Sequence, residues 1–547
     1  MIQNPIKMSN GKFLNLFFVI EIIFFGLMVT GILPRETALY LGVALVIYFL
    51  VTSLEDSLVF FVRSIPLFLA MPLTESFDNF NTWRILAIIV FLKWFAVKYQ
   101  FFQKQGFWNF SRSLASNWRS TLKNHLNIRE PSFLLFVLLI LAIFSVIPAP
   151  DKIAAIKRII YFLNFAILGV VIYDKASNKE FTKRLIRNSI IPVAIVAAVG
   201  YIQVISTYFI DIYQFMRVWG EGIQCRQFGE QWCNIAVWLG NTWFAYYGEQ
   251  LSLRVFSLFP DSHSFPQFVL LGIPAILAVV QKRWLRITSL SFLFLIIILS
   301  GTRGIWAASM GVVLLALGIV LYVKKQVSLK SAIADFRDTK QIKRVAGYLT
   351  IFFIMFPVAF PIFSSPQFLV GKADDEILKA RIKSILDFGE TSNVQRIEIW
   401  KKTLSSIKEK PLLGVGIGNF PVVLGQDIRL AKAGSSAHNL YLNIAAEMGM
   451  IAGAVFIWFL WLVFKKNYEI LTKPNMNLYY DRSINSTLKN SFKDDFLTIY
   501  FAATLLFVPW VLIYSLTDVA ILDERALLMF VVTVSIILAH KNPIRSG

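Results

Sequence analysis

Two arginines are the first residues in this sequence that could do chemistry. Arg303 lies in SGTRG, a short turn with glycine on either side, where the backbone could approach a ligand closely. Arg396 falls one helical turn before Trp400, so the two side chains share a face. A guanidinium stays charged at any relevant pH and donates paired hydrogen bonds, so phosphate is its natural ligand. The alternatives are an arginine reaching to a membrane interface and an ordinary surface charge.

A histidine at the head of a long apolar run is the third candidate. His438 is one of only four histidines, and it follows the segment AKAGSSA directly. We read it as the start of a membrane helix, where it could act as a base at the outer surface, although lone histidines are more often structural. Asn439 could orient it. Glu447, roughly two to three turns further on, is expected to be a buried hydrogen-bonding anchor.

Two further segments hold polar residues that could bind a substrate. RVFSLFPDSHSFP contains Arg254, Asp261 and His263, and the histidine again opens an apolar run. SLTDVAILDER, near the end of the chain, contains Asp518. No Ser/His/Asp order and no Asp-x-Asp metal pair rises above chance in these segments. We treat the four residues as candidates for substrate binding.

The two cysteines, Cys225 and Cys233, close the segment CRQFGEQWC. We expect a disulfide between them if this loop faces an oxidising compartment, and two free thiols otherwise. Neither C-x-x-C nor a Cys/His cluster with zinc spacing occurs, so no metal site or cofactor is expected. The glycine-rich GVGIGNF lacks the G-x-G-x-x-G spacing and the preceding strand of a dinucleotide-binding loop.

The elements that must position these residues are membrane helices. Hydrophobic residues make up 56% of the 547-residue chain and charged residues only 16%, which is too apolar for a soluble protein. Apolar runs of roughly 17 to 25 residues predict membrane spans. We find fourteen candidates, beginning near residues 13, 36, 57, 83, 132, 153, 189, 263, 285, 304, 345, 438, 496 and 520. The third and sixth carry charges, and either could be interfacial or re-entrant. The expected fold is an all-α polytopic membrane protein with about 12 to 14 transmembrane helices.

The basic residues set the expected topology. The net charge of +21 comes from short Lys/Arg clusters in alternate loops, the pattern of cytoplasmic loops, so it requires no nucleic acid partner. Both termini are therefore predicted to be cytoplasmic. The expected regions are N-terminal transmembrane helices (1–209), a first long periplasmic loop (210–262), central transmembrane helices (263–364), a large periplasmic loop (365–437) and C-terminal transmembrane helices (438–547).

The large outer loop is expected to contain two amphipathic helices. Apolar residues recur at helical spacing in two stretches, namely Leu378, Ile382, Ile385 and Leu386, and then Val394, Ile397, Trp400, Leu404 and Ile407. Both helices should lie on the outer surface. Arg396 belongs to the second.

The order of these motifs resembles a known family. SGTRG, then RIEIWKKTLSSIKEKPLLGVGIGNF, then AHNLYLNIAAEMGMIAG is similar to the signature region of the O-antigen ligase and O-antigen polymerase superfamily, over about Ser300 to Phe464. RVFSLFPDSHSFPQFV resembles the preceding segment more loosely. The first two hundred residues match only in being membrane spans. The resemblance implies a helical, GT-C-like glycosyltransferase of the bacterial inner membrane that works on the periplasmic side without a metal or a nucleotide sugar.

The resemblance also implies roles for individual residues. The family's two essential arginines fall on Arg303 and Arg396, and its histidine falls on His438; Asp518 is a weaker match to a carboxylate near the last spans. The donor would be a glycan on undecaprenyl pyrophosphate. The arginines would bind the pyrophosphate, and the histidine would position or deprotonate an acceptor hydroxyl, with inversion at the anomeric carbon.

Several functions remain open at this point. A ligase would transfer the glycan to lipid A core, the acceptor that we prefer, whereas a polymerase would transfer it to another lipid-linked unit. A protein O-oligosaccharyltransferase shares the same motifs. A transporter or flippase would use these residues to line a substrate path, but it would more often show repeats and charges near the midplane. The expected partners are the lipid-linked donor, a lipid or glycan acceptor and the bilayer.

Overall fold

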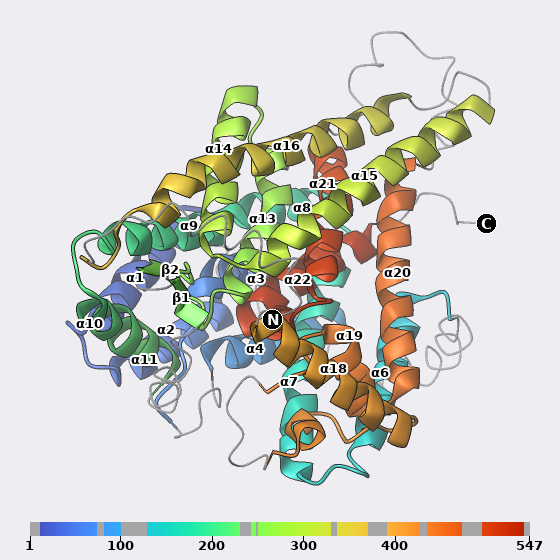
Figure 1. Ribbon diagram of the computed structural model, residues 1–547, viewed down its shortest axis with the longest axis horizontal. Helices are drawn as coiled ribbons and strands as arrows, with labels where there is room; N and C mark the ends of the chain where they lie inside the picture. Colours follow the sequence, from blue (N-terminus) through green and yellow to red (C-terminus); the bar gives the residue numbers. More distant parts are fainter. Residues whose placement is uncertain are drawn as a thin grey trace, which may run out of the picture. The chain divides into compact units, whose positions relative to one another are not determined.

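The computed structural model describes residues 11–73, 81–99, 128–229, 242–247, 250–329, 336–369, 391–426, 435–472 and 495–540. Helices make up nearly all of the structure described (Figure 1). By internal contacts the chain divides into two compact units. The first comprises Met1–Lys175, Phe209–Asn241 and Gly389–Leu462, and the second comprises Ala176–Tyr208, Thr242–Phe388 and Val463–Gly547. The expected all-α membrane fold is confirmed.

The first unit combines N-terminal helices with a late segment of the chain. Its α-helices are α1 (Gly11–Val29), α2 (Thr37–Val51), α3 (Leu54–Ser64), α4 (Thr82–Lys98), α6 (Pro131–Ser145), α7 (Lys152–Lys175), α10 (Ile212–Phe215), α11 (Cys225–Phe228), α18 (Thr391–Glu409) and α19 (Leu440–Met448). Two 3-10 turns, η1 (Ile65–Leu67) and η3 (Phe420–Leu424), and a π-helix, η2 (Met216–Gln224), complete it. Helix α20 (Met450–Thr472) begins in this unit and ends in the second.

The second unit contains the central and C-terminal helices. These are α8 (Lys179–Asn188), α9 (Ile190–Ser206), α13 (Ser264–Val279), α14 (Arg283–Leu299), α15 (Arg303–Leu329), α16 (Phe336–Ser364), α21 (Asp495–Tyr514), the 3-10 turn η6 (Ala520–Leu522) and α22 (Glu524–Ala539). Strands β1 (Phe244–Tyr247) and β2 (Gln250–Leu253) form the only sheet among the described residues, an antiparallel hairpin with Phe244 opposite Leu253.

Seven helices in the described part of the chain are long and apolar enough to cross a membrane. They cover Gly11–Val29, Lys152–Lys175, Lys179–Ser206, Arg303–Tyr322, Gln341–Ser364, Met450–Thr472 and Phe496–Tyr514. The sixth predicted span is among them, because α7 has 24 residues and its charged residues lie toward its two ends. The third is not, because α3 has only 11 residues, about 16 Å of helix, and the chain then turns at Pro66.

The span predicted from residue 438 begins later than expected. Gly449 separates the short α19 from α20, and only α20 is long enough to cross a membrane. The φ of Gly449 is 90°, and a Cβ there would lie 2.1 Å from the carbonyl oxygen of Leu412. This φ lies outside the helical range, so the helix breaks at Gly449, and the position leaves no room for a side chain. His438 therefore precedes a short helix, and its predicted place at the start of a span is wrong.

The glycine-rich segment GVGIGNF is a structural connector in the first unit. The N–H groups of Val415 and Gly416 donate to the carbonyls of Ala446 and Glu447 at 2.9 Å each, at the end of α19. The next N–H, that of Ile417, donates to the Ser145 hydroxyl at the end of α6. The segment therefore joins α19 to α6 through backbone hydrogen bonds, which is consistent with our rejection of a nucleotide-binding loop.

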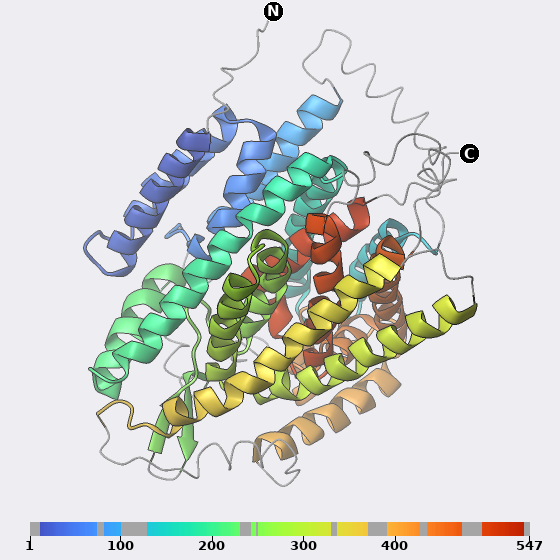
Figure 2. The ribbon, with the colours of Figure 1, turned by 90° about the horizontal axis from the view of Figure 1, so that it is seen from above.

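Helices α13 and α21 form the centre of the second unit. Every residue of α13 from Ser264 to Ala278 is buried, and the helix packs against α21, α22 and α9. The Trp510 side chain of α21 donates to the carbonyl of Ile305, in the first turn of α15, at 3.0 Å. Helices α15 and α16 run alongside one another (Figure 2), with the rings of Trp306 and Phe356 in contact. This packing holds the ends of α13, α15 and α21 in fixed positions.

Replacing Gly416 with alanine should destabilise the protein. Gly416 has φ 98°, and a Cβ would lie 2.4 Å from the Cβ of Ala149 and 2.7 Å from its Cα. Backbone strain and this clash should together cost about 2 kcal/mol or more. Gly318→Ala is the matched control, because no atom lies within 4 Å of the added Cβ. Thermal unfolding in detergent should show a lower midpoint for Gly416→Ala only; equal midpoints would contradict the connector role.

Candidate functional site

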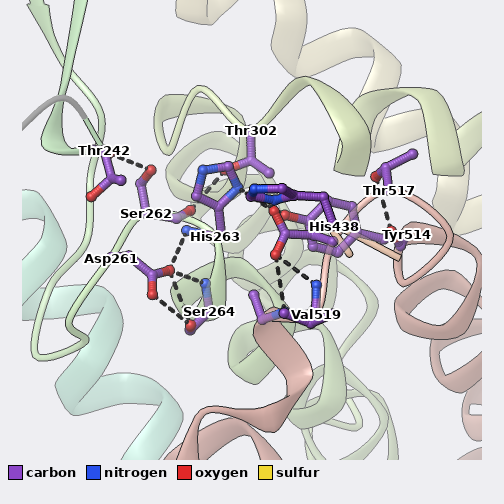
Figure 3. Close-up of polar contacts among 12 residues, drawn as sticks. Thr242, Asp261, Ser262, His263, Ser264, Thr302, His438, Tyr514, Thr517 and Val519 are labelled. Carbon is purple, nitrogen blue, oxygen red and sulfur yellow. Dashed lines mark hydrogen bonds and ion pairs between the residues drawn. The ribbon is translucent and has the colours of Figure 1, made fainter. Parts of the chain in front are cut away.

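The loop between β2 and α13 presents a histidine on a rigid turn. The Asp261 carboxylate accepts hydrogen bonds from the N–H groups of His263 and Ser264, at 2.8 Å each, and from the Ser264 hydroxyl (Figure 3). The Ser262 hydroxyl donates to the carbonyl of Thr242, which ties the turn to the chain before β1. Desolvation raises the pKa of Asp261, and the nearby Asp518 raises it further. Asp261 thus fixes the backbone that carries His263.

Three of the predicted substrate-binding residues, Arg254, His263 and Asp518, lie together around the His263 ring. Its Nδ1 lies 2.9 Å from the Tyr514 hydroxyl and 3.2 Å from Oδ2 of Asp518. Its Nε2 lies 3.3 Å from Nη2 of Arg254. Asp518 is itself buried and accepts hydrogen bonds from the N–H groups of Val519 and Ala520. We call Arg254, His263, Tyr514 and Asp518 the His263 cluster.

The turn that carries Arg303 is attached to the same loop. The Thr302 hydroxyl donates to the carbonyl of Ser262 at 2.7 Å. The Arg254 Nε donates to the carbonyl of Ser300 at 3.4 Å. On the other side of Arg303, a Cβ on Gly304 would lie 2.6 Å from the Tyr514 ring. Arg303 begins α15 with a partly buried side chain. Within the second unit, its turn and the His263 cluster therefore form one hydrogen-bonded structure.

A second carboxylate at the head of a helix was missed by the sequence analysis. The Asp523 side chain accepts from the N–H groups of Arg525 and Ala526 and caps α22. Desolvation raises the pKa of Asp523 to about 7, and the negative charge of Asp261 contributes to this rise. The positive charge of the fully buried Arg525 acts in the opposite direction and lowers the pKa. The signal was the Asp–Glu–Arg sequence at the head of an apolar run, the pattern of an N-cap.

In the first unit, His438 occupies a strained turn. Its φ is 46°, in the left-handed region that non-glycine residues rarely adopt. The side chain of Asn439 accepts from the N–H groups of Tyr441 and Leu442, at 3.0 Å each, and caps α19. The Ala437 N–H donates to the Asn443 side chain. Asn439 therefore supports the backbone next to His438.

Trp400 connects this turn to the helix that carries Arg396. The indole Nε1 of Trp400 donates to the carbonyl of Ala437 at 2.9 Å, and α18 packs against α19. Arg396 lies one turn earlier in α18, with a partly buried side chain. The structure thus brings α18 to the residue immediately before His438. Trp400 was predicted only as an apolar residue, because its hydrogen bond joins residues 37 positions apart. The first predicted amphipathic helix lies outside the described residues.

Glu447 lies in a buried, hydrogen-bonded position, as expected for a structural residue. The carboxylate is buried and accepts hydrogen bonds from the backbone of Gly418 and Phe420 and from the side chain of Asn443. Burial raises its pKa, whereas the charge of Arg158 lowers it. These contacts attach α19 to the glycine-rich segment.

The cysteine prediction is only partly within the described residues. Cys225, the first residue of α11, is buried and disulfide-bonded. Its expected partner, Cys233, lies outside the described residues, so the pairing stays a prediction. Among the residues that the structure describes, no group of three or more His, Cys, Asp or Glu side chains could hold a metal ion.

The central part of the chain is similar to a known protein family. Residues 288–457 match a family model described as O-antigen ligase. This range contains Arg303, Arg396 and His438, and it leaves out Arg254, His263 and Asp518. Comparison with curated protein sequences gives no match.

Replacing Asp523 with asparagine should change how stability depends on pH. The folded-state pKa of the Asp523 carboxyl, about 7, exceeds the ordinary value of about 3.9. Its contribution to the stability of the folded state is therefore greatest below about pH 4 and is lost as the pH rises through 7. Asparagine keeps the capping oxygen without the charge. Unfolding midpoints in detergent between pH 5 and pH 8 should therefore fall less in Asp523→Asn than in the wild type.

Asp523→Ala is the control, because alanine removes the cap as well as the charge and should cost about 1 kcal/mol. If Asp523→Asn and the wild type lost stability in parallel between pH 5 and pH 8, Asp523 would not be the titrating group.

Proposed function

We propose that this protein is a membrane glycosyltransferase that acts on lipid-linked glycans, because residues 288–457 match the family model described as O-antigen ligase. It moves a glycan from undecaprenyl pyrophosphate to an acceptor hydroxyl, with lipid A core as the preferred acceptor. The observation that carries this proposal is the presence of Arg303, Arg396 and His438 inside the matched range. These residue types can bind a pyrophosphate and accept a proton.

The proposed reaction is a single displacement at the anomeric carbon. The acceptor oxygen attacks that carbon, the bond to the pyrophosphate oxygen breaks, and the acceptor's proton passes to the His438 imidazole. The electron pair of the broken bond leaves with undecaprenyl pyrophosphate, and the configuration inverts. Arg303 and Arg396 bind the pyrophosphate and stabilise the negative charge that grows on it. Arg254 and Asp518 contribute to substrate binding.

The backbone conformation of His438 supports a catalytic role for this residue. A left-handed backbone at a non-glycine residue costs about 1 to 3 kcal/mol and persists where the surrounding structure enforces it. Here Asn439, Asn443 and Trp400 hold the residues on either side. A turn fixed in this way holds the backbone from which the imidazole projects, and proton transfer requires a positioned base.

We also propose that the reaction takes place on the outer face of the bacterial inner membrane, with both termini in the cytoplasm. The alternation of basic loops supports this orientation. A lipid-linked donor and a membrane-bound acceptor would both reach a site at that surface by diffusion in the bilayer.

Glycan transfer by the purified protein in proteoliposomes tests the reaction. Arg303→Ala should lower the rate of transfer from the lipid-linked donor about 100-fold or more, and Arg303→Lys should recover part of it, because a lysine keeps the charge but not the paired donors. The control is Arg283→Ala, which removes an exposed arginine from the head of α14. Full transfer by Arg303→Ala would exclude the proposed role of Arg303, and absence of transfer by the folded wild type would favour a transporter.

His438→Gly tests the histidine separately from the fold. Glycine adopts φ 46° without strain, so this variant should keep the wild-type unfolding midpoint or exceed it. Because it lacks the imidazole, transfer should fall about 100-fold. Retained transfer would exclude His438 as the base.

Ligase and polymerase activities differ in the product that a gene deletion leaves. We expect gels of surface glycans to show lipid A core without polymer, while polymer still accumulates on the lipid carrier. Single repeat units remaining on the core would instead identify a polymerase. A catalytically inactive Arg303→Ala gene should reproduce the deletion, and wild-type complementation should reverse it.

A further inference from the structure

The hydrogen bonds of His263 determine which of its nitrogens carries a proton. An arginine side chain can only donate, so Nε2 of His263, 3.3 Å from Nη2 of Arg254, must offer a lone pair. The proton of a neutral imidazole is then on Nδ1, where the Tyr514 hydroxyl at 2.9 Å and Asp518 at 3.2 Å can accept it. The cluster therefore selects the neutral Nδ1–H tautomer.

Two of the hydrogen bonds of the Arg254 side chain go to the turn before Arg303 and to His263. Its Nε donates to the carbonyl of Ser300, three residues before Arg303, and its Nη2 donates to His263. The backbone beside it has separate support, because the Val255 N–H donates to the carbonyl of Leu299 at 3.1 Å and the Thr302 hydroxyl donates to that of Ser262. Loss of the imidazole would thus remove one of the bonds that orient the guanidinium while leaving the loop attached to the turn.

We propose that His263 is a positioning residue, whose neutral imidazole orients the Arg254 guanidinium toward the phosphates of the donor beside the turn that carries Arg303. This inference rests on the proposed function, because it assigns the pyrophosphate of the lipid-linked donor as the ligand of Arg254. His263 itself contacts no substrate in this arrangement. Its effect reaches the donor through Arg254 alone.

The arrangement makes donor binding sensitive to acid. Protonation at Nε2 removes the acceptor for Arg254 and places a second positive charge 3.3 Å from the guanidinium nitrogen. Among the described residues, the titratable and charged groups that face His263 include Tyr514 at the end of α21, Asp518 just after it, Arg254 after β2, and Asp261 in its own turn. Asp518 favours the imidazolium, but it cannot restore the lost acceptor. The orientation of Arg254 is therefore lost as the pH falls.

Binding of undecaprenyl pyrophosphate to the full-length protein in detergent tests this role without requiring transfer. His263→Phe should raise the Kd about tenfold, the scale expected for losing a hydrogen bond to a charged group. His263→Gln supplies an amide oxygen to Arg254 and does not titrate, so its Kd should stay near that of the wild type at pH 7.5. The wild-type Kd should rise between pH 7.5 and pH 5.5, and His263→Gln should abolish most of that rise.

Histidine ¹⁵N NMR of the wild type provides a second readout. The protein has four histidines, and the His263 signals are those lost in His263→Gln. We expect a neutral ring at pH 7.5 that is protonated on Nδ1. His540→Gln is the control, because His540 lies at the far end of α22 and should affect neither readout.

Several results would overturn the inference. They are a ring protonated on Nε2 or on both nitrogens at pH 7.5, equal Kd values for the Phe and Gln variants, or no measurable binding by a wild type that is folded by its unfolding midpoint. Failure of glycan transfer with normal binding would instead count against the proposed reaction and leave the role of His263 intact.

Discussion

A helix that begins in apolar surroundings must satisfy its first backbone N–H groups, and this requirement shapes both polar regions of the protein. Asp261 serves the head of α13, Asp523 serves α22, and Asn439 serves α19. Two of these capping side chains lie beside a residue with a proposed role in the reaction, Asp261 near His263 and Asn439 next to His438. The polar groups that chemistry needs are thus placed where the fold already needs polar groups.

The same helix ends have an electrostatic consequence. The N-terminus of a helix carries partial positive charge and favours anions. Arg303 begins α15, and His263 and His438 lie just before α13 and α19. Within the second unit, burial raises the pKa values of the Asp261 and Asp523 carboxyls, and each is raised further by a neighbouring carboxylate. The guanidinium of Arg525 offsets the charge of the Asp523 carboxylate.

Rigid connections explain how these ends are kept in place. In the second unit, the bonds from Thr302 to Ser262 and from Trp510 to Ile305 fix the turn around Arg303 from two sides. In the first unit, Trp400 and the glycine-rich segment hold the two ends of α19. Orientation of reacting groups is worth several kcal/mol in enzymes, and it depends on supports of this kind. The strained backbone of His438 is consistent with such enforcement.

The sequence by itself determined the class of fold and the residues worth testing. Long apolar runs indicate membrane spans. SGTRG, the Arg396 helix and the His438–Asn439 pair place polar groups beside such runs, where burying them costs free energy, so they are candidates for function. The tertiary structure decided which of them meet. It paired His263 with Tyr514 across 251 residues and Trp400 with Ala437, and it broke the helix at Gly449, where φ is 90° and no Cβ fits. Periodicity reports which face of one helix is apolar, whereas hydrogen bonds and steric limits between distant segments arise only when helices pack.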